Sequence, residues 1–181
     1  MRGDPESPSG TRYRAARRAF IAACEKAHVE TVARLHPAKA PDGKPLFMDC
    51  AAKGPRHAPL AVLALAHDAP GGDMLMALLD QPEPPPDARL VLVHAFDPAR
   101  FAGVAGDAGA PLTMLQAVAT EDLSRVKQLG VLSLLSNDPA RDRAVMAVLK
   151  SALPGARITL LPSAASARKA QQTAASFFGA H

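Results

Sequence analysis

Apolar residues in this chain gather in short, nearly unbroken runs rather than in strict alternation with polar residues. Two of these runs, Leu60–Ala66 and Leu90–Ala95, are bounded by Pro, Gly and charged residues, which is typical of strands buried on both faces of a sheet. Two shorter runs, Val131–Leu135 and Ile158–Leu161, share this character. Because stretches with helical spacing separate the runs, the pattern predicts parallel strands joined by right-handed crossover helices.

The stretches between the runs place apolar residues three and four positions apart, which predicts helices that bury one face. These helices are expected over residues 71–81, 112–128, 139–153 and 164–178. The third begins at Pro139, because Asn137 or Asp138 before it is a favourable N-cap and proline suits the first helical position. In this helix Ala144 and Val145 are expected to face the core.

The first third of the chain predicts a helix followed by a β-hairpin. Helical spacing of apolar residues extends over Thr11–Ala27. Residues 29–52 predict two antiparallel strands, the first ending at His36-Pro37, with a Pro-Asp-Gly turn inside the loop over 38–45. Residues 1–10 are rich in Pro, Gly, Ser and charge, so they predict a disordered arm.

Together these elements predict one three-layer α/β domain over residues 11–181, whose mixed sheet opens with an antiparallel hairpin and continues with parallel βα units. At 181 residues, with 48% apolar and 21% charged residues, the chain has the composition of a globular domain with its own core. Cys24 and Cys50 lack CxxC spacing, which indicates buried thiols in a reducing compartment. The sequence shows neither a signal-peptide pattern nor a membrane-spanning run, so we expect a cytoplasmic protein without membrane contact.

Positive charge is concentrated in the first predicted helix, and the whole chain carries a formal net charge of +4. Arg14, Arg17 and Arg18 are the candidate contacts for an acidic polymer. Aromatic residues are scarce beside them, which disfavours nucleic acid as a partner and favours a solvated helix face. Binding of an acidic polymer through this helix is therefore kept as a secondary interpretation.

Histidine and aspartate follow both long apolar runs, at the place where ligands collect in open α/β sheets. His67-Asp68 follows the first run, and His94 and Asp97 mark the end of the second. One interpretation is a metal site built from His67, Asp68 and Asp73, with His94 nearby, because imidazole and carboxylate groups are ordinary zinc ligands. The competing interpretation, which we favour, is that the aspartates cap the following turns or helices and that His94 bonds to the backbone. The sequence contains no nucleophile-elbow or phosphate-loop motif.

The first half of the chain resembles a known family of hydrolases. The segment His36–Asp49, the apolar run before His67 and the segment Val91–Phe101 follow the order and approximate form found in bacterial zinc-carboxypeptidase-like hydrolases of the metallocarboxypeptidase clan. The resemblance covers roughly residues 12–103. It implies a three-layer α/β fold and, in the intact family, a catalytic zinc.

The resemblance breaks at the residues that zinc chemistry requires. His67 matches the first ligand of the family, whereas Pro70 stands where the family has a ligating Glu. Asp97 stands where the family has Asn, and with Arg100 it is a candidate binding residue. The later His ligand has no counterpart, because the only His after His94 is the terminal residue of the sequence.

We therefore expect a shortened, degenerate member of this family that binds no cofactor and acts as a non-catalytic binding, scaffolding or regulatory subunit. A partner protein or a homo-oligomer is expected, because loss of the substrate half would expose apolar surface. The alternative is a small metal-dependent peptidase or amidase, in which zinc occupies a site rebuilt from His67, Asp68 or Asp73 and His94.

Overall fold

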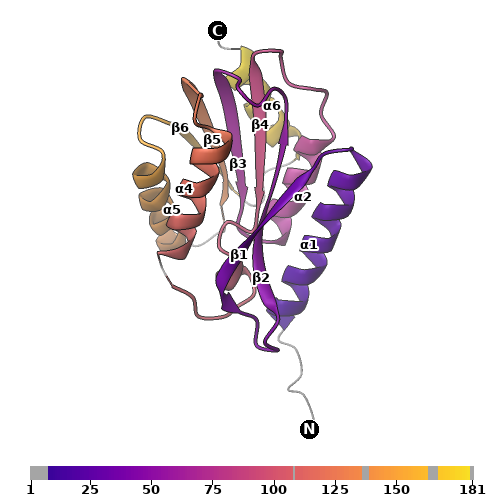
Figure 1. The fold of residues 1–181 in the computed structure, drawn as a ribbon, viewed down its shortest axis with the longest axis vertical. Helices are drawn as coiled ribbons and strands as arrows, with labels where there is room; N and C mark the ends of the chain where they lie inside the picture. The colour runs from indigo at the N-terminus through magenta and orange to yellow at the C-terminus, as the bar shows by residue number, and fades with distance from the viewer. Residues whose placement is uncertain (1–7, 108, 136–138, 163–166, 180–181) are drawn as a thin grey trace.

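A mixed six-stranded sheet forms the centre of the molecule, in a computed structural model that describes residues 8–107, 109–135, 139–162 and 167–179 (Figure 1). The strands are β1 (Thr31–Lys39), β2 (Pro45–Lys53), β3 (Leu60–Ala66), β4 (Ala88–His94), β5 (Gln128–Leu135) and β6 (Arg157–Pro162). The helices are α1 (Pro8–Lys26), α2 (Ala69–Leu79), α3 (Pro98–Phe101), α4 (Ala110–Asp122), α5 (Pro139–Ala152) and α6 (Ala167–Gly179). The predicted fold class, one α/β domain with a mixed sheet, is confirmed.

The order of strands across the sheet is β1-β2-β4-β3-β5-β6. β1 pairs antiparallel with β2, and β2 pairs antiparallel with β4. The strands β4, β3, β5 and β6 are parallel to one another. The predicted hairpin and the predicted parallel βα units are therefore both present, and parallel pairing brings the carboxyl ends of four strands to one edge of the sheet.

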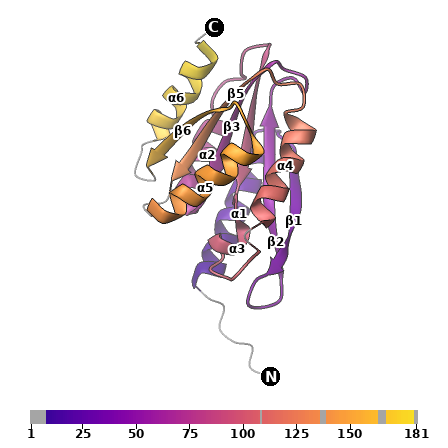
Figure 2. The same cartoon turned by 90° about the vertical axis from the view of Figure 1, so that its left-hand side faces the viewer.

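Helices cover both faces of the sheet and give the fold three layers. α1, α2 and α6 pack on one face around Phe20 and Leu75, and α4 and α5 pack on the other around Leu115 and Leu149 (Figure 2). Every residue of β3 and β4 is buried, because both faces of these two strands are covered. Within the described ranges, none of the helices combines the length and the hydropathy needed to cross a membrane.

A phenol and a bidentate ion pair help to fix α1 to the hairpin. The Tyr13 hydroxyl donates to the carbonyl oxygen of Phe47 at 2.9 Å and accepts from the amide of the same residue at 2.8 Å. Arg17 donates from Nε and Nη2 to the two carboxylate oxygens of Asp49, at 2.7 and 3.0 Å. This bidentate pairing compensates the burial of the Asp49 side chain, which is 1% exposed.

Several element boundaries differ from the sequence prediction; α4 ends at Asp122 rather than at residue 128, and β5 begins at Gln128 rather than at Val131. α1 begins at Pro8, and the part of the predicted arm before it, residues 1–7, lies outside the described residues. β1 continues past His36-Pro37 as far as Lys39, with an irregular register after Leu35. Proline is compatible with this strand because β1 is the last strand of the sheet, where a missing amide donor is tolerated.

The short helix α3 has no counterpart in the sequence prediction. The side chain of Asp97 accepts a hydrogen bond from the amide of Arg100, and Pro98 occupies the first helical turn. The same combination of Asx and Pro predicts the start of α5, whose expected N-cap, Asn137 or Asp138, lies outside the described residues. The signal for α3 was therefore present in the sequence, but the helix is only one turn long.

Candidate functional site

A cleft of about 310 Å³ lies at the carboxyl edge of the parallel strands. Its polar lining consists of His67, Asp97, Arg100 and Asp107, and apolar residues of α5 form the facing wall. Ala144 of α5, which the sequence analysis expected to face the core, is exposed and belongs to this wall. The position of the cleft is the one at which open α/β sheets bind their ligands.

Neighbouring strands bring His67 and Asp97 to this cleft. His67 directly follows β3, is 2% exposed, and meets the edge of the Phe96 ring with the ring centroids 5.3 Å apart. Asp97 lies three residues beyond β4, and its carboxylate accepts a hydrogen bond from the Arg100 amide at 3.2 Å. The two residues come to the same place because β3 and β4 pair directly in the sheet.

The two carboxylates predicted for a metal site, Asp68 and Asp73, do not form such a site with any described residues. Asp68 is the N-cap of α2, and its side chain accepts a hydrogen bond from the amide of Gly71 at 2.9 Å. Asp73 lies on an exposed position of the same helix. For Asp68 and Asp97 the capping interpretation is therefore the one that the hydrogen bonds support.

His94 lies on the opposite face of the sheet from the cleft. Val93 packs in the cluster under α4 and α5, and His94, the next residue of the strand, stacks on Phe20 of α1 with ring centroids 5.1 Å apart. The imidazole is completely buried, and neither ring nitrogen has a hydrogen-bond partner among the described residues. The expectation that His94 bonds to the backbone is therefore wrong. Burial, assisted by the positive charge of Arg17, lowers the pKa of His94 to about 4.

A catalytic zinc requires three nitrogen or oxygen ligands around one point and an open position for water. Within the part of the chain that the structure describes, no group of three or more His, Cys, Asp or Glu side chains is arranged to hold a metal ion. His67 lies in the cleft, His94 lies across the sheet, and Asp68 caps a helix. The described residues thus do not fit the zinc of the family that the sequence resembles.

The arginines predicted to bind an acidic polymer have different surroundings. Arg17 is paired with Asp49, and Arg14 donates to Asp42 in the hairpin loop at 2.8 Å. Arg18 is exposed on α1 and makes no hydrogen bond or ion pair with any described residue. α1 therefore uses part of its positive charge to hold the hairpin and leaves part of it at the surface.

His36 is a buried histidine that was not among the predicted site residues. Its Nδ1 accepts a hydrogen bond from the amide of Ala38, while its Nε2 has no partner among the described residues. Burial lowers its pKa, although the charges of Asp97 and Asp107 oppose this shift. The His-Pro sequence indicated only the end of a strand. In the structure the imidazole lies beside Gly106 of the cleft, where an added Cβ atom would stand 3.4 Å from Cε1 of His36.

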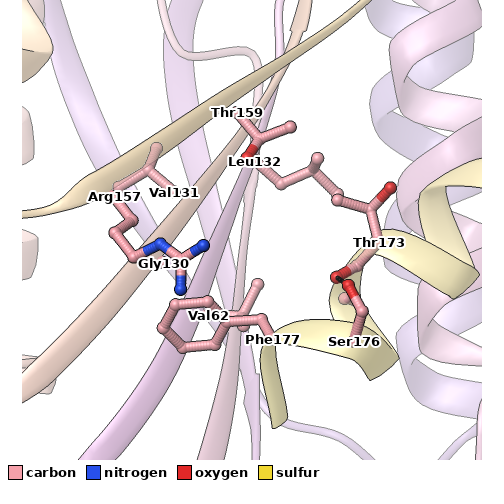
Figure 3. Close-up of a pocket in the computed structure, with 10 residues that line it drawn as sticks. Val62, Gly130, Val131, Leu132, Arg157, Thr159, Thr173, Ser176 and Phe177 are labelled. Atoms are coloured by element: carbon pink, nitrogen blue, oxygen red, sulfur yellow. Dashed lines mark hydrogen bonds between the residues drawn. The ribbon is translucent and has the colours of Figure 1, made fainter. Parts of the chain in front are cut away.

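A smaller hollow of about 90 Å³ lies between α6 and the amino ends of β5 and β6 (Figure 3). The Phe177 ring lies against Gly130, where a Cβ atom would stand only 2.5 Å from the ring. Arg157 and the hydroxyl of Thr159 border the hollow from β6. Its volume is too small for most organic ligands, so we assign it to packing of α6 on the sheet.

Cys24 and Cys50 are free and buried, as the sequence predicted. Burial raises the pKa of Cys24 to about 11 and that of Cys50 to about 12. Both residues are therefore protonated thiols at neutral pH, which is the form without nucleophilic character.

No family model and no curated protein matches this sequence. Among solved structures, the chain is similar to a putative Zn-dependent exopeptidase from Bacteroides vulgatus, with a TM-score of 0.50, 10% sequence identity, and coverage of 98% of this chain and 96% of the other. It is also similar to the glutaminyl cyclase of Macrostomum lignano, with a TM-score of 0.43, 12% identity, and coverage of 89% of this chain and 68% of the other. The similarity to the glutaminyl cyclase of Porphyromonas gingivalis has a TM-score of 0.42 and 12% identity, and it covers 94% of this chain and 80% of the other.

At this level of identity the likeness concerns the fold alone. The alignment with the Bacteroides vulgatus protein extends over nearly the whole of both chains, so it includes the six-stranded sheet and its helices. The three-layer fold implied by the sequence resemblance is therefore supported, whereas the assignment to carboxypeptidase-like hydrolases in particular stays a prediction.

Proposed function

We propose that this chain is a non-catalytic domain with the fold of a zinc exopeptidase, acting as a binding, scaffolding or regulatory subunit. The observation that carries the proposal is the use of the carboxylates at the ends of β3 and β4. Asp68 and Asp97 each accept a hydrogen bond from the first turn of the helix that follows. These hydrogen bonds orient both carboxylates toward the helix amides, and within the described residues no three His, Cys, Asp or Glu side chains are grouped as a zinc site requires.

The cleft retains what a binding site needs. Its volume of about 310 Å³ is at the lower end of the range for small-molecule sites. An apolar wall formed by Val145 and Val148 faces the polar residues His67, Asp97 and Arg100. This combination of an apolar wall and a few polar groups suits recognition without chemistry.

A small metal-dependent hydrolase is the alternative, and one observation favours it. His67 and Asp97 share the cleft, and Asp107 lines it as well, so an imidazole and two carboxylates are available from one side of the sheet. Movement of the capping carboxylate of Asp97 toward His67 would be required to form a zinc site from these residues.

A hydrolysis assay in the presence of excess zinc distinguishes the two proposals. Aminoacyl p-nitroanilides and blocked dipeptides are suitable substrates, and the His67→Ala variant is the control. We expect the same background rate for both proteins with and without zinc, because the described residues do not complete a zinc site. Zinc-dependent turnover that disappears in His67→Ala would establish the hydrolase instead.

A further inference from the structure

A second groove of about 260 Å³ is lined by residues of α1 and by Lys44, Pro45 and Phe47 of the hairpin. The helix α1 lies on the opposite side of the hairpin from α4 (Figure 1). The residues that give it chemical character are Arg14, Arg17, Arg18, Lys44, Ile21 and Phe47. Four of its lining residues are cations and none of its lining residues is a carboxylate. Two carboxylates neighbour these four cations: Asp42 pairs with both Arg14 and Lys44, and Asp49 pairs with Arg17, so the groove keeps a net positive charge.

The floor of the groove is apolar. The guanidinium carbon of Arg17 lies 4.3 Å from the centre of the Phe47 ring, which is half-buried, and Ile21 lies one helical turn further along α1. Leu35 pairs with Phe47 across the hairpin, and opposed residues of an antiparallel pair point to the same face of the sheet. Leu35 is 65% exposed, so the apolar floor continues as far as the edge of the sheet.

The same edge offers backbone groups to a partner. β1 is the last strand of the sheet, and it has regular pairing with β2 from Thr31 to Leu35. An edge strand presents a row of amide and carbonyl groups to an extended segment that comes alongside it. Val32 and Leu35 on this strand are the large apolar residues with the greatest exposure among the described residues.

We propose that this surface, which we term the α1–hairpin groove, binds an acidic peptide segment of a partner protein that carries an apolar anchor residue. The apolar residue lies on Phe47 and Leu35, and carboxylates on either side meet Arg18 and Lys44. Arg18 is available because it has no ion pair with a described residue. The ion pairs with Asp42 and Asp49 hold Arg14 and Arg17 in place, so these two side chains lose little further entropy when a partner binds.

A second copy of this chain is a poorer occupant of the groove. Symmetric association would bring two net positive grooves together, and like charges across an interface disfavour binding. Single-stranded nucleic acid is also a poorer occupant, because successive bases need several exposed aromatic rings, whereas the groove offers the half-buried Phe47 and its other aromatic residue, Tyr13, is buried. An acidic segment with an apolar residue matches both the positive charge and the apolar floor of the groove.

The test uses the full chain and a capped, fluorescently labelled peptide of alternating glutamate and valine. We expect this peptide to bind with an affinity that falls as salt is raised, whereas a lysine–valine peptide of the same length does not bind. Arg18→Glu and Leu35→Glu should each weaken binding by about tenfold or more, since both residues are exposed and change the groove without changing the core. Arg12→Glu makes the same change of net charge on an exposed position of α1 outside the groove, and we expect an effect below about twofold.

Several results would overturn this proposal. Equal losses in Arg18→Glu and Arg12→Glu would mean that only the overall charge of the protein matters. Tighter binding of a single-stranded oligonucleotide than of the acidic peptide would assign the groove to nucleic acid. A dimer in sedimentation that Leu35→Glu converts to monomer would assign the surface to a second copy. Each of these outcomes leaves the proposal for the cleft unaffected, because the two surfaces share no residue.

Discussion

Phe20→Ala is expected to lower the free energy of unfolding by about 3–5 kcal/mol, because it removes a completely buried ring from the core between α1 and the sheet. Phe20 belongs to the cluster that joins α1, α2 and α6, so a cavity at this position affects three helices at once. Its ring also stacks on His94, whose nitrogens have no hydrogen-bond partner among the described residues. Water that enters the cavity would reach this imidazole, and part of the loss is recovered in that way.

Urea denaturation at neutral pH measures this effect. Leu35→Ala is the matched control, because it also removes a large apolar side chain, but one that is 65% exposed. We expect the control to change stability by less than about 0.5 kcal/mol. Similar losses in the two variants would show that α1 does not pack on the sheet as described.

His94→Leu is expected to make the protein more resistant to acid. The unfolded chain binds a proton at His94 near the ordinary histidine pKa of about 6.5, whereas burial lowers the pKa in the folded protein to about 4. Between these two values the unfolded state binds more protons, so stability is complete above the unfolded pKa and is lost as the pH falls. The loss amounts to roughly 1.4 kcal/mol per pH unit in this window, or about 2 kcal/mol at pH 5.

Denaturation curves from neutral to acidic pH measure this loss for the wild type and for His94→Leu. The variant should be at least as stable at neutral pH, because it removes a buried polar group without partners, and its stability should decline less toward acid. The stability of the variant should still decline somewhat toward acid, because burial also lowers the pKa of His36. His57→Gln, which changes an exposed histidine, is the control and should lose stability toward acid as the wild type does. A His94→Leu stability curve that runs parallel to that of the wild type would contradict the account.

Much of the fold follows from local sequence patterns. The run Leu60–Ala66 coincides with β3, because buried parallel strands are short, apolar and sharply bounded. The hairpin follows from the turn at residues 41–43, where Gly43 has a positive φ of 78° that glycine adopts without strain. Such features depend only on residues that are close in the sequence, and for this reason they can be predicted from it.

The candidate site was less predictable, because it depends on which face of the sheet each side chain meets. His67 and His94 both mark strand ends, yet one lies in the cleft and the other is buried under α1. The sequence pattern does not indicate which helices cover which face of the sheet. The pairing of Arg17 with Asp49 likewise joins residues 32 positions apart, and no local pattern separates such an arginine from a solvated one.

The central claim is a proposal: this chain, whose fold is similar to that of a putative Zn-dependent exopeptidase, performs no metal chemistry. Metal content of the protein, purified without an affinity tag and equilibrated with zinc, tests this claim most directly. We predict no stoichiometric zinc, and no difference in zinc content between the wild type and His67→Ala, because Asp68 and Asp97 are held as helix caps and His94 lies across the sheet. A stoichiometric zinc that His67→Ala removes would contradict the claim and would place a metal site in the cleft.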